Sequence, residues 1–260
     1  MLLCPVRACH LPLVREQKRL FCPRQHSFDV ARSGYVNLLQ PQDRRSKQPG
    51  DTAAAVAARR RLHDRGVTGP LLEGIAEIVS AKSDDIVLDA GCGDGFYLGT
   101  LANRAGFDAH GVDISIPAVN AAALRFPQYE WIVANADRFV PYASASFSLV
   151  LSLTARMNAS EFRRVLRSYG RLLVAIPSAD DLIELRRENG GPGRDRVDRT
   201  METFAREFRL VHRASVTTAA DLDQASVADV LLSIYRPMRS RPVQAMRVTF
   251  SLDLLLFQPK

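Results

Sequence analysis

The sequence predicts an α/β protein in which a doubly wound parallel sheet follows a small, metal-stapled N-terminal module. Three observations predict this fold. From Ile86 onward, short apolar runs alternate with helical segments of roughly ten residues, a pattern typical of a parallel sheet covered on both faces. A glycine-rich turn, at residues 91–95, joins the first apolar run to the first of these helices. Three of the four cysteines lie within the first 22 residues.

The N-terminal cysteines form the pattern Cys4-x4-Cys9-x12-Cys22-x3-His26. Two ligand pairs separated by about a dozen residues are typical of a tetrahedral Cys3His zinc site, which would be structural because all four positions are filled. Disulfides, which the cytosol disfavours, and cysteines buried as small apolar residues are the alternatives. His10 competes with His26 as the fourth ligand, but the spacing favours Cys4, Cys9, Cys22 and His26.

The positive charge of the chain is concentrated near its start. The net charge is +7, yet residues 1–66 hold 13 Lys and Arg against 5 Asp and Glu, and the remainder is close to neutral. Such a basic segment attracts phosphate backbones, although a solvated surface is the simpler interpretation. A second basic stretch follows at Arg236, Arg239, Arg241 and Arg247. No apolar run approaches the length of a membrane span and no secretory signal is evident, so we expect a cytoplasmic protein.

The predicted organisation has three parts: a zinc-binding module at residues 1–40, a basic linker with helices at 41–82, and the sheet domain at 83–260. A hairpin is expected at 10–21 and linker helices at 52–64 and 70–81. Seven strands are expected at 86–90, 109–114, 129–134, 147–153, 171–177, 208–217 and 245–258. Helices are expected at 96–104, 116–125, 160–168, 180–188, 199–207 and 221–233, and a loop at 189–196.

The glycine-rich turn carries the strongest chemical signal. It reads Asp89-x-Gly91-x-Gly93-Asp94-Gly95, at the end of a predicted strand and the start of a helix. Glycines let the backbone turn sharply and approach a ligand closely, as in dinucleotide sites. The spacing differs from the dinucleotide motif, and an acid two positions before the first glycine suits a cationic amino-acid tail better than a pyrophosphate. The turn therefore favours S-adenosylmethionine.

Two further strands end in acidic residues. Asp113, followed by Ile114, could accept both ribose hydroxyls of an adenosine, and Asp137 could reach the adenine amino group. Each acid alone could equally be a turn former, but acids at three successive strand ends are typical of cofactor binding. The sequence thus predicts a Rossmann-like class I S-adenosylmethionine methyltransferase with a seven-stranded doubly wound sheet and a small N-terminal zinc-binding module.

From about residue 4 to residue 177 the chain resembles the bacterial 23S rRNA (guanine-N1)-methyltransferases of the RlmA type. The N-terminal motif is the most specific part of this resemblance, and the cofactor motifs are shared by many substrate classes. The matching segments are 21–39, 46–51, 58–60, 87–95 and 111–115. The resemblance implies methyl transfer from S-adenosylmethionine to N1 of a guanine in a 23S rRNA hairpin, with the zinc module helping to hold RNA. Tyr35, Phe28 and Phe21 are candidates for base stacking, although a small core around the zinc better explains the two phenylalanines.

The chain departs from the family pattern around one pocket. The resemblance implies cofactor contacts at Thr68 and Asp181, where the family has Tyr and His, and residues 154–157 replace a Tyr-Ala-Pro stretch beside the reacting base. Three hypotheses stay open: an active rRNA enzyme, a methyltransferase with another RNA or small-molecule substrate, and a non-catalytic RNA-binding descendant. Asp137, Asp181 and Arg156 fall in segments expected near the pocket, but none is a clear general base. The sequence also leaves open whether the protein is a homodimer.

Overall fold

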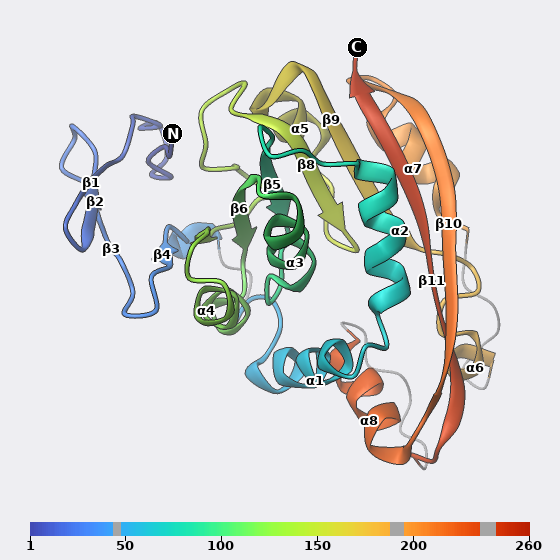
Figure 1. The fold of residues 1–260 in the computed structure, drawn as a ribbon. Coiled ribbons are helices and arrows are strands. Elements are labelled where there is room, and N and C mark those ends of the chain that lie inside the picture. Colours follow the sequence, from blue (N-terminus) through green and yellow to red (C-terminus); the bar gives the residue numbers. More distant parts are fainter. Residues whose placement is uncertain (44–47, 188–194, 235–242) are drawn as a thin grey trace.

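A computed structural model describes residues 1–43, 48–187, 195–234 and 243–260 (Figure 1). A three-stranded antiparallel sheet contains β1 (Val14–Glu16), β2 (Arg19–Phe21) and β3 (Ser27–Asp29). The second sheet has eight strands in the order β10-β11-β9-β8-β5-β6-β7-β4. Its strands are β4 (Val36–Asn37), β5 (Ile86–Ala90), β6 (Asp108–Asp113), β7 (Glu130–Val133), β8 (Phe147–Leu153), β9 (Leu166–Pro177), β10 (Phe208–Leu222) and β11 (Met246–Pro259). Strands β4 to β9 run parallel, whereas β11 pairs antiparallel with both β9 and β10.

Two helices, α1 (Ala53–Asp64) and α2 (Gly69–Val79), precede the central strand β5. The helices that follow are α3 (Phe96–Ala105), α4 (Ile116–Arg125), α5 (Ala159–Val165), α6 (Ile183–Arg187), α7 (Val197–Phe204) and α8 (Gln224–Ser233), and a 3-10 turn η1 covers Pro41–Asp43. Side-chain caps set several helix starts: Thr52, Ser115, Asn158 and Asp223 each accept a bond from a backbone N–H of the first turn.

The large sheet separates two hydrophobic cores. Because neighbouring residues of a strand face opposite sides, Val87 enters one core and Leu88 the other. The first core receives residues of α2, α3, α4 and α8. The second receives Phe162 of α5 and Phe204 of α7, and also apolar residues of the N-terminal module, including Leu20. The module therefore contributes to the covering of one face of the sheet.

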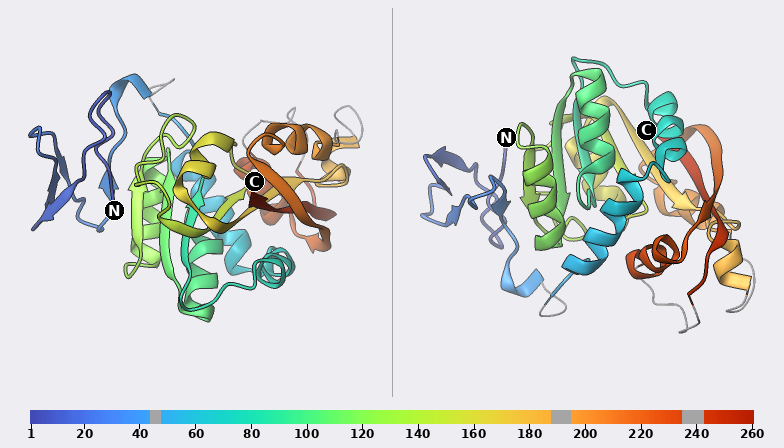
Figure 2. Two further views of the ribbon diagram at one scale, coloured as in Figure 1. Left: turned by 90° about the horizontal axis from the view of Figure 1, so that it is seen from above. Right: turned by 60° about the horizontal axis from the view of Figure 1, so that its bottom comes forward.

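Backbone bonds attach this module to the sheet domain. Leu3 donates its N–H to the carbonyl of Pro141, and Ala143 donates to the carbonyl of Met1. Farther along, β4 adds beside β7 as an eighth, parallel edge strand, with Val36 opposite Ile132. In Figure 2 the module lies at the β4 end of the sheet, far from the long strands β10 and β11.

Most predicted elements are confirmed, and β5, β8 and α4 have the predicted bounds. The seven predicted strands are all present, and β4 makes an eighth. The prediction for residues 166–168 as helix is wrong: α5 ends at Val165 and β9 starts at Leu166, because Leu166 pairs with Phe147 before a register shift. Strand β10 also extends beyond Thr217 to Leu222, along the full length of its hairpin with β11. Most of the predicted loop at 189–196, and Arg236, Arg239 and Arg241, lie outside the described residues.

Helix α1 lies beneath the ends of the parallel strands, beside α8 (Figure 1). Arg61 of α1 forms a two-pronged ion pair with Asp229 of α8, at 2.5 and 2.9 Å. Arg65, at the end of α1, bonds Ser226 of α8. In the part of the chain that the structure describes, no helix has the length and apolar character needed to cross a membrane.

Candidate metal centre and cofactor site

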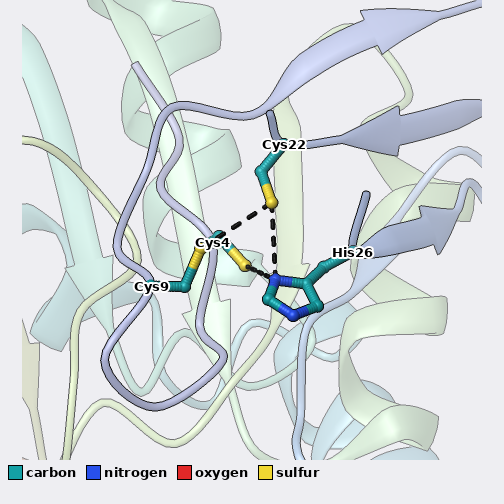
Figure 3. Close-up of side chains that lie close together, drawn as sticks. All are labelled: Cys4, Cys9, Cys22 and His26. Atoms are coloured by element: carbon teal, nitrogen blue, oxygen red, sulfur yellow. Dashed lines mark hydrogen bonds between the residues drawn. The ribbon is translucent and has the colours of Figure 1, made fainter. Parts of the chain in front are cut away.

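Three thiols and one imidazole converge in the N-terminal module (Figure 3). One potential ligand atom from each of Cys4, Cys9, Cys22 and His26 lies within 4.8 Å of all the others. The Nδ1 atom of His26 is 3.4 Å from the Sγ atoms of both Cys4 and Cys22, and the Sγ atoms of Cys9 and Cys22 are 3.7 Å apart. Two tight turns position these four side chains. In one turn the Cys9 N–H donates to the carbonyl of Val6, and in the other the Gln25 N–H donates to the carbonyl of Cys22.

These distances fit a zinc ion. With Zn–S bonds of about 2.3 Å and a Zn–N bond of about 2.0 Å, a tetrahedron separates two sulfurs by about 3.8 Å and a sulfur from the nitrogen by about 3.5 Å. Burial raises the pKa of the Cys4 thiol, and a bound cation would stabilise the thiolate that metal ligation requires. His10 lies outside the cluster and stacks on Phe139, with ring centroids 4.2 Å apart.

The cofactor motif lies at the carboxyl edge of the large sheet, where β5 and β6 end side by side. Asp89 is the fourth residue of β5 and is only 2% exposed. Its Oδ1 atom is buried without a hydrogen-bond partner among the described residues. Burial, with the nearby Asp113 carboxylate, raises the pKa of Asp89 to about 8. A buried acceptor of this kind is costly unless a ligand donates to it.

The glycine turn is closely packed as well as sharply bent. Gly91 has φ +99°, and a Cβ built there would lie 2.3 Å from the Cβ of Ala155, in the loop after β8. Gly95 caps α3 with φ +74°, and Gly93 has φ +55°. All three glycines thus adopt a positive φ that side chains oppose, and at Gly91 the turn also lies too close to Ala155 for a side chain.

Asp113, the last residue of β6, braces the turn. Its Oδ2 accepts from Gly93 N–H at 3.0 Å and its Oδ1 accepts from Ser115 N–H at 2.8 Å. Burial raises the pKa of this carboxyl, and the two backbone bonds oppose the shift. Ile114, next in sequence, packs against the first core. A carboxylate fixed in this way still has lone pairs for two ribose hydroxyls.

Asp94 belongs to a buried polar cluster that also contains residues of the linker helices. One Asp94 oxygen lies 3.9 Å from His63 Nε2, and its Oδ2 is buried without a partner among the described residues. His63 of α1 stacks on Phe96 with centroids 3.9 Å apart. Burial, together with nearby Arg59 and Arg125, lowers the pKa of His63 to about 3, so the imidazole is neutral at physiological pH. The Nδ1 atom of His63 forms a 2.6 Å hydrogen bond with the hydroxyl of Thr68.

Thr68 and Asp181 both influence the buried phenol of Tyr97. Burial raises the pKa of the Tyr97 phenol, the hydrogen bond with Thr68 opposes this shift, and the Asp181 charge adds to it. Asp181 accepts from Ser251 N–H at 3.1 Å, lies 3.4 Å from Arg186, and has a pKa that burial raises to about 6. Both departures from the family pattern therefore act on the same tyrosine, Thr68 through a hydrogen bond and Asp181 through its charge.

Asp137 lies in the loop after β7. Its Oδ2 is 3.5 Å from Nε of Arg156, in the loop after β8. Asn158 donates to the backbone carbonyl of Asp137 at 2.8 Å, which ties the two loops together. The structure thus brings Arg156 and Asp137 into one exposed ion pair beside the strand ends.

Sequence reasoning missed three residues of this region: Arg59, His63 and Tyr97. Tyr97 stands two positions after Gly95, so its place at the start of α3 was a usable signal. His63 carried no spacing signal, because its contact with Asp94 depends on how α1 packs. Arg59 belongs to the family motif at residues 58–60, which by itself assigns it no role.

Comparison with known proteins agrees with this geometry. Residues 2–47 match the family model for the zinc ribbon of RlmA, N-terminal, and residues 87–175 match a methyltransferase domain. A structure of the Haloferax volcanii Trm112 activator with a provisionally named methyltransferase shares the fold, with a TM-score of 0.54, 18% identity, and coverage of 80% of this chain and 98% of that one. The MccD protein gives a TM-score of 0.51 at 18% identity, covering 73% of this chain and 96% of that chain.

The fold and its two sites define a class I S-adenosylmethionine methyltransferase that carries an N-terminal zinc ribbon. The 23S rRNA (guanine(748)-N1)-methyltransferase of Streptomyces fradiae is 36% identical over 86% of this chain and 81% of its own length. A Micromonospora griseorubida protein provisionally named a 23S rRNA (guanine-N1)-methyltransferase is 35% identical over 70% of this chain and 67% of its own. The chain belongs to the 23S rRNA (guanine-N1)-methyltransferase family.

Proposed function

We propose that this protein transfers a methyl group from S-adenosylmethionine to N1 of a guanine in a 23S rRNA hairpin. The observation that carries the proposal is the combination of a zinc ribbon with a methyltransferase sheet, in a chain whose relatives are named for this reaction. The positive surplus of residues 1–66 supports an RNA partner, because phosphate contacts hold an RNA hairpin in place.

Each predicted site residue receives a role in this proposal. The zinc ion would be held by Cys4, Cys9, Cys22 and His26. The cofactor would be held by the turn Asp89, Gly91, Gly93, Asp94 and Gly95, by Asp113 and Ile114 at the ribose, by Asp137 near the adenine, and by Thr68 and Asp181. Residues 1–40, 41–82 and 83–260 would be the zinc module, the linker with its helices, and the methyltransferase domain.

The chain must hold an activated methyl group and a guanine N1 in line, since positioning carries much of the rate of such a displacement. S-adenosylmethionine supplies that methyl group on a sulfonium centre. Guanine N1 loses a proton during the reaction, and the loops after β7 and β8 bring the Arg156–Asp137 ion pair to the same edge of the sheet. Extrusion of the base would expose its N1 edge.

Primer extension tests the proposal directly, because an N1 methyl group blocks base pairing and stops reverse transcriptase. The purified protein and S-adenosylmethionine are incubated with unmodified 23S rRNA from a strain that lacks the gene. We expect one new stop at a hairpin guanine. An unchanged stop pattern, with cofactor binding shown separately, would exclude this substrate and favour another RNA or a small molecule.

Two further properties belong to the proposal. We assign the protein to the cytoplasm, where rRNA is assembled into ribosomes. The second property is the oligomeric state: light scattering with and without RNA shows whether the protein is a monomer or a homodimer.

A further inference from the structure

The linker segment Pro49-Gly50-Asp51 packs directly on the turn that follows β6. A Cβ built on Gly50 would lie 2.7 Å from the Cβ of Ser115 and 3.0 Å from Cγ2 of Ile114. Ser115 donates its hydroxyl to the Asp51 carbonyl at 2.7 Å. The linker is therefore fixed beside Asp113, the acid expected at the ribose.

Asp51 in turn holds Arg59 of α1. The guanidinium Nη1 lies 2.6 Å from Asp51 Oδ2, and Nη2 donates to the carbonyl of Ser233 at the end of α8, at 3.0 Å. The Arg59 side chain is 29% exposed and that of Asp51 is 20% exposed. Contacts from two other elements thus fix the direction of this long side chain.

Arg59 points at the glycine turn. Its Nη1 lies 3.6 Å from the position that a Cβ on Gly93 would occupy. It is close enough to Asp94 and Asp113 for its charge to favour both carboxylates. A guanidinium has five N–H donors, and Asp51 and Ser233 account for two of them.

The charges around the turn match the two ends of an amino acid. The buried Asp89 Oδ1 has no donor among the described residues and suits an ammonium group. The exposed edge of a guanidinium suits a carboxylate, which it binds with two parallel hydrogen bonds. Both groups lie at one glycine turn, and an amino-acid tail carries one ammonium and one carboxylate.

We propose that Arg59, held in place by Asp51 and the end of α8, binds the carboxylate of the cofactor's amino-acid tail. This inference rests on the proposed cofactor and adds a residue to its site. It also assigns a role to residues 50–51 and Arg59 within the family motifs: they form a wall beside the glycine turn.

Calorimetry with two ligands tests the proposal without any methyl transfer. S-adenosylhomocysteine has the amino-acid tail, whereas 5′-methylthioadenosine keeps the adenosine and sulfur but lacks that tail. For Arg59→Met we expect a Kd for S-adenosylhomocysteine roughly 10-fold or more above that of the wild type, from the lost charged hydrogen bonds. The Kd for 5′-methylthioadenosine should stay within about twofold.

Arg60→Met is the matched control, because Arg60 is on the same helix but its side chain is 46% exposed and lies 3.8 Å from Asp64. It should change neither Kd, and Arg59→Lys should recover part of the lost affinity. Unchanged binding of S-adenosylhomocysteine by Arg59→Met would overturn the inference. An equal loss for both ligands would also overturn it, since Arg59 would then only support the fold. Wild-type protein that binds neither ligand would contradict the proposed cofactor itself.

Discussion

The zinc module and the methyltransferase sheet reach a folded state by different physical means. In the module, β1 has three exposed residues, and β2 and β3 are only partly buried. In the large sheet, all seven residues of β8 are buried. The few buried residues of the module, Cys4 and Cys22 among them, add to one core of the sheet, whereas the sheet buries apolar side chains on both of its faces. This difference indicates that metal ligation stabilises the module and hydrophobic burial stabilises the sheet.

The largest expected effect follows from removing one metal ligand. Cys22→Ser should abolish stoichiometric zinc binding and unfold the segment that contains β1, β2 and β3, since structural zinc contributes on the order of 10 kcal/mol to folding such units. Atomic absorption gives the zinc content, and hydrogen exchange compares amides of β2 with those of β8. Protection of β8 should persist.

Cys92→Ser is the matched control, since Cys92 is buried beside Gly111 and lies outside the metal cluster. It should retain one zinc per chain. If Cys22→Ser also kept its zinc and the protection of β2, the module would not depend on the metal and the contrast between the regions would fail.

A pair of glycines allows the same backbone conformation to be compared in both regions. Gly34 has φ +102° with nothing within 4 Å of a built Cβ, and Gly91 has φ +99° with Ala155 at 2.3 Å. Gly34→Ala should cost about 1 kcal/mol, the penalty for a left-handed backbone. Gly91→Ala should cost roughly 3 kcal/mol or more and abolish S-adenosylhomocysteine binding, because overpacking adds to that penalty.

Denaturant unfolding measures both costs. The double variant Gly91→Ala with Ala155→Gly should recover part of the stability, since it removes the clashing methyl group. Equal costs at the two glycines would show that packing against Ala155 contributes nothing.

The pH dependence of the free energy of unfolding should show whether the buried Asp89 carboxyl serves ligand binding or stabilises the fold. The folded-state pKa of Asp89 is about 8, whereas an exposed aspartate has a pKa of 3.8, so between these values the folded protein binds more protons than the unfolded chain. The free energy of unfolding should therefore fall as pH rises through this window. Asp89→Asn should remove much of this decline and stabilise the free protein at pH 8 by about 2 kcal/mol.

The same variant should bind S-adenosylhomocysteine much more weakly. Urea titrations at pH 5 and pH 8 supply the stabilities, and calorimetry supplies the affinity. If Asp89→Asn were less stable than the wild type at pH 8, the carboxylate would have a structural role. The weaker binding of S-adenosylhomocysteine would then be a consequence of the damaged fold.

The sequence predicted best what depends on local patterns. Strands β5 and β8 are short apolar runs, so periodicity alone gave their bounds. It could not predict that β9 begins at Leu166, because a register shift against β8 sets that start. Strand β10 extends past Thr217 because it pairs along β11, a partner about thirty residues away, and its exposed residues carry little hydrophobic signal.

The same distinction holds for the sites. Spacing alone grouped the four metal ligands and the acids at the strand ends. It could not reveal that Arg59 reaches Gly93, because that contact requires α1 to pack between the linker and α8. It also could not show that Asp89 lacks an internal donor, since satisfaction of a buried group depends on the whole surrounding structure.

The smallest expected effect tests whether the two regions are coupled. The His10 ring lies nearly parallel to that of Phe139, which follows β7 in the methyltransferase domain. His10→Asn removes the ring while keeping a residue that tolerates the positive φ of +47° at this position. The lost stacking should cost roughly 0.5–1 kcal/mol. Hydrogen exchange should speed up at the Leu3 amide, which bonds Pro141 across the junction, with zinc content unchanged. Unchanged exchange at Leu3 would mean that the stacked pair adds nothing to the attachment, leaving the backbone bonds and the shared apolar core to hold the module on the sheet.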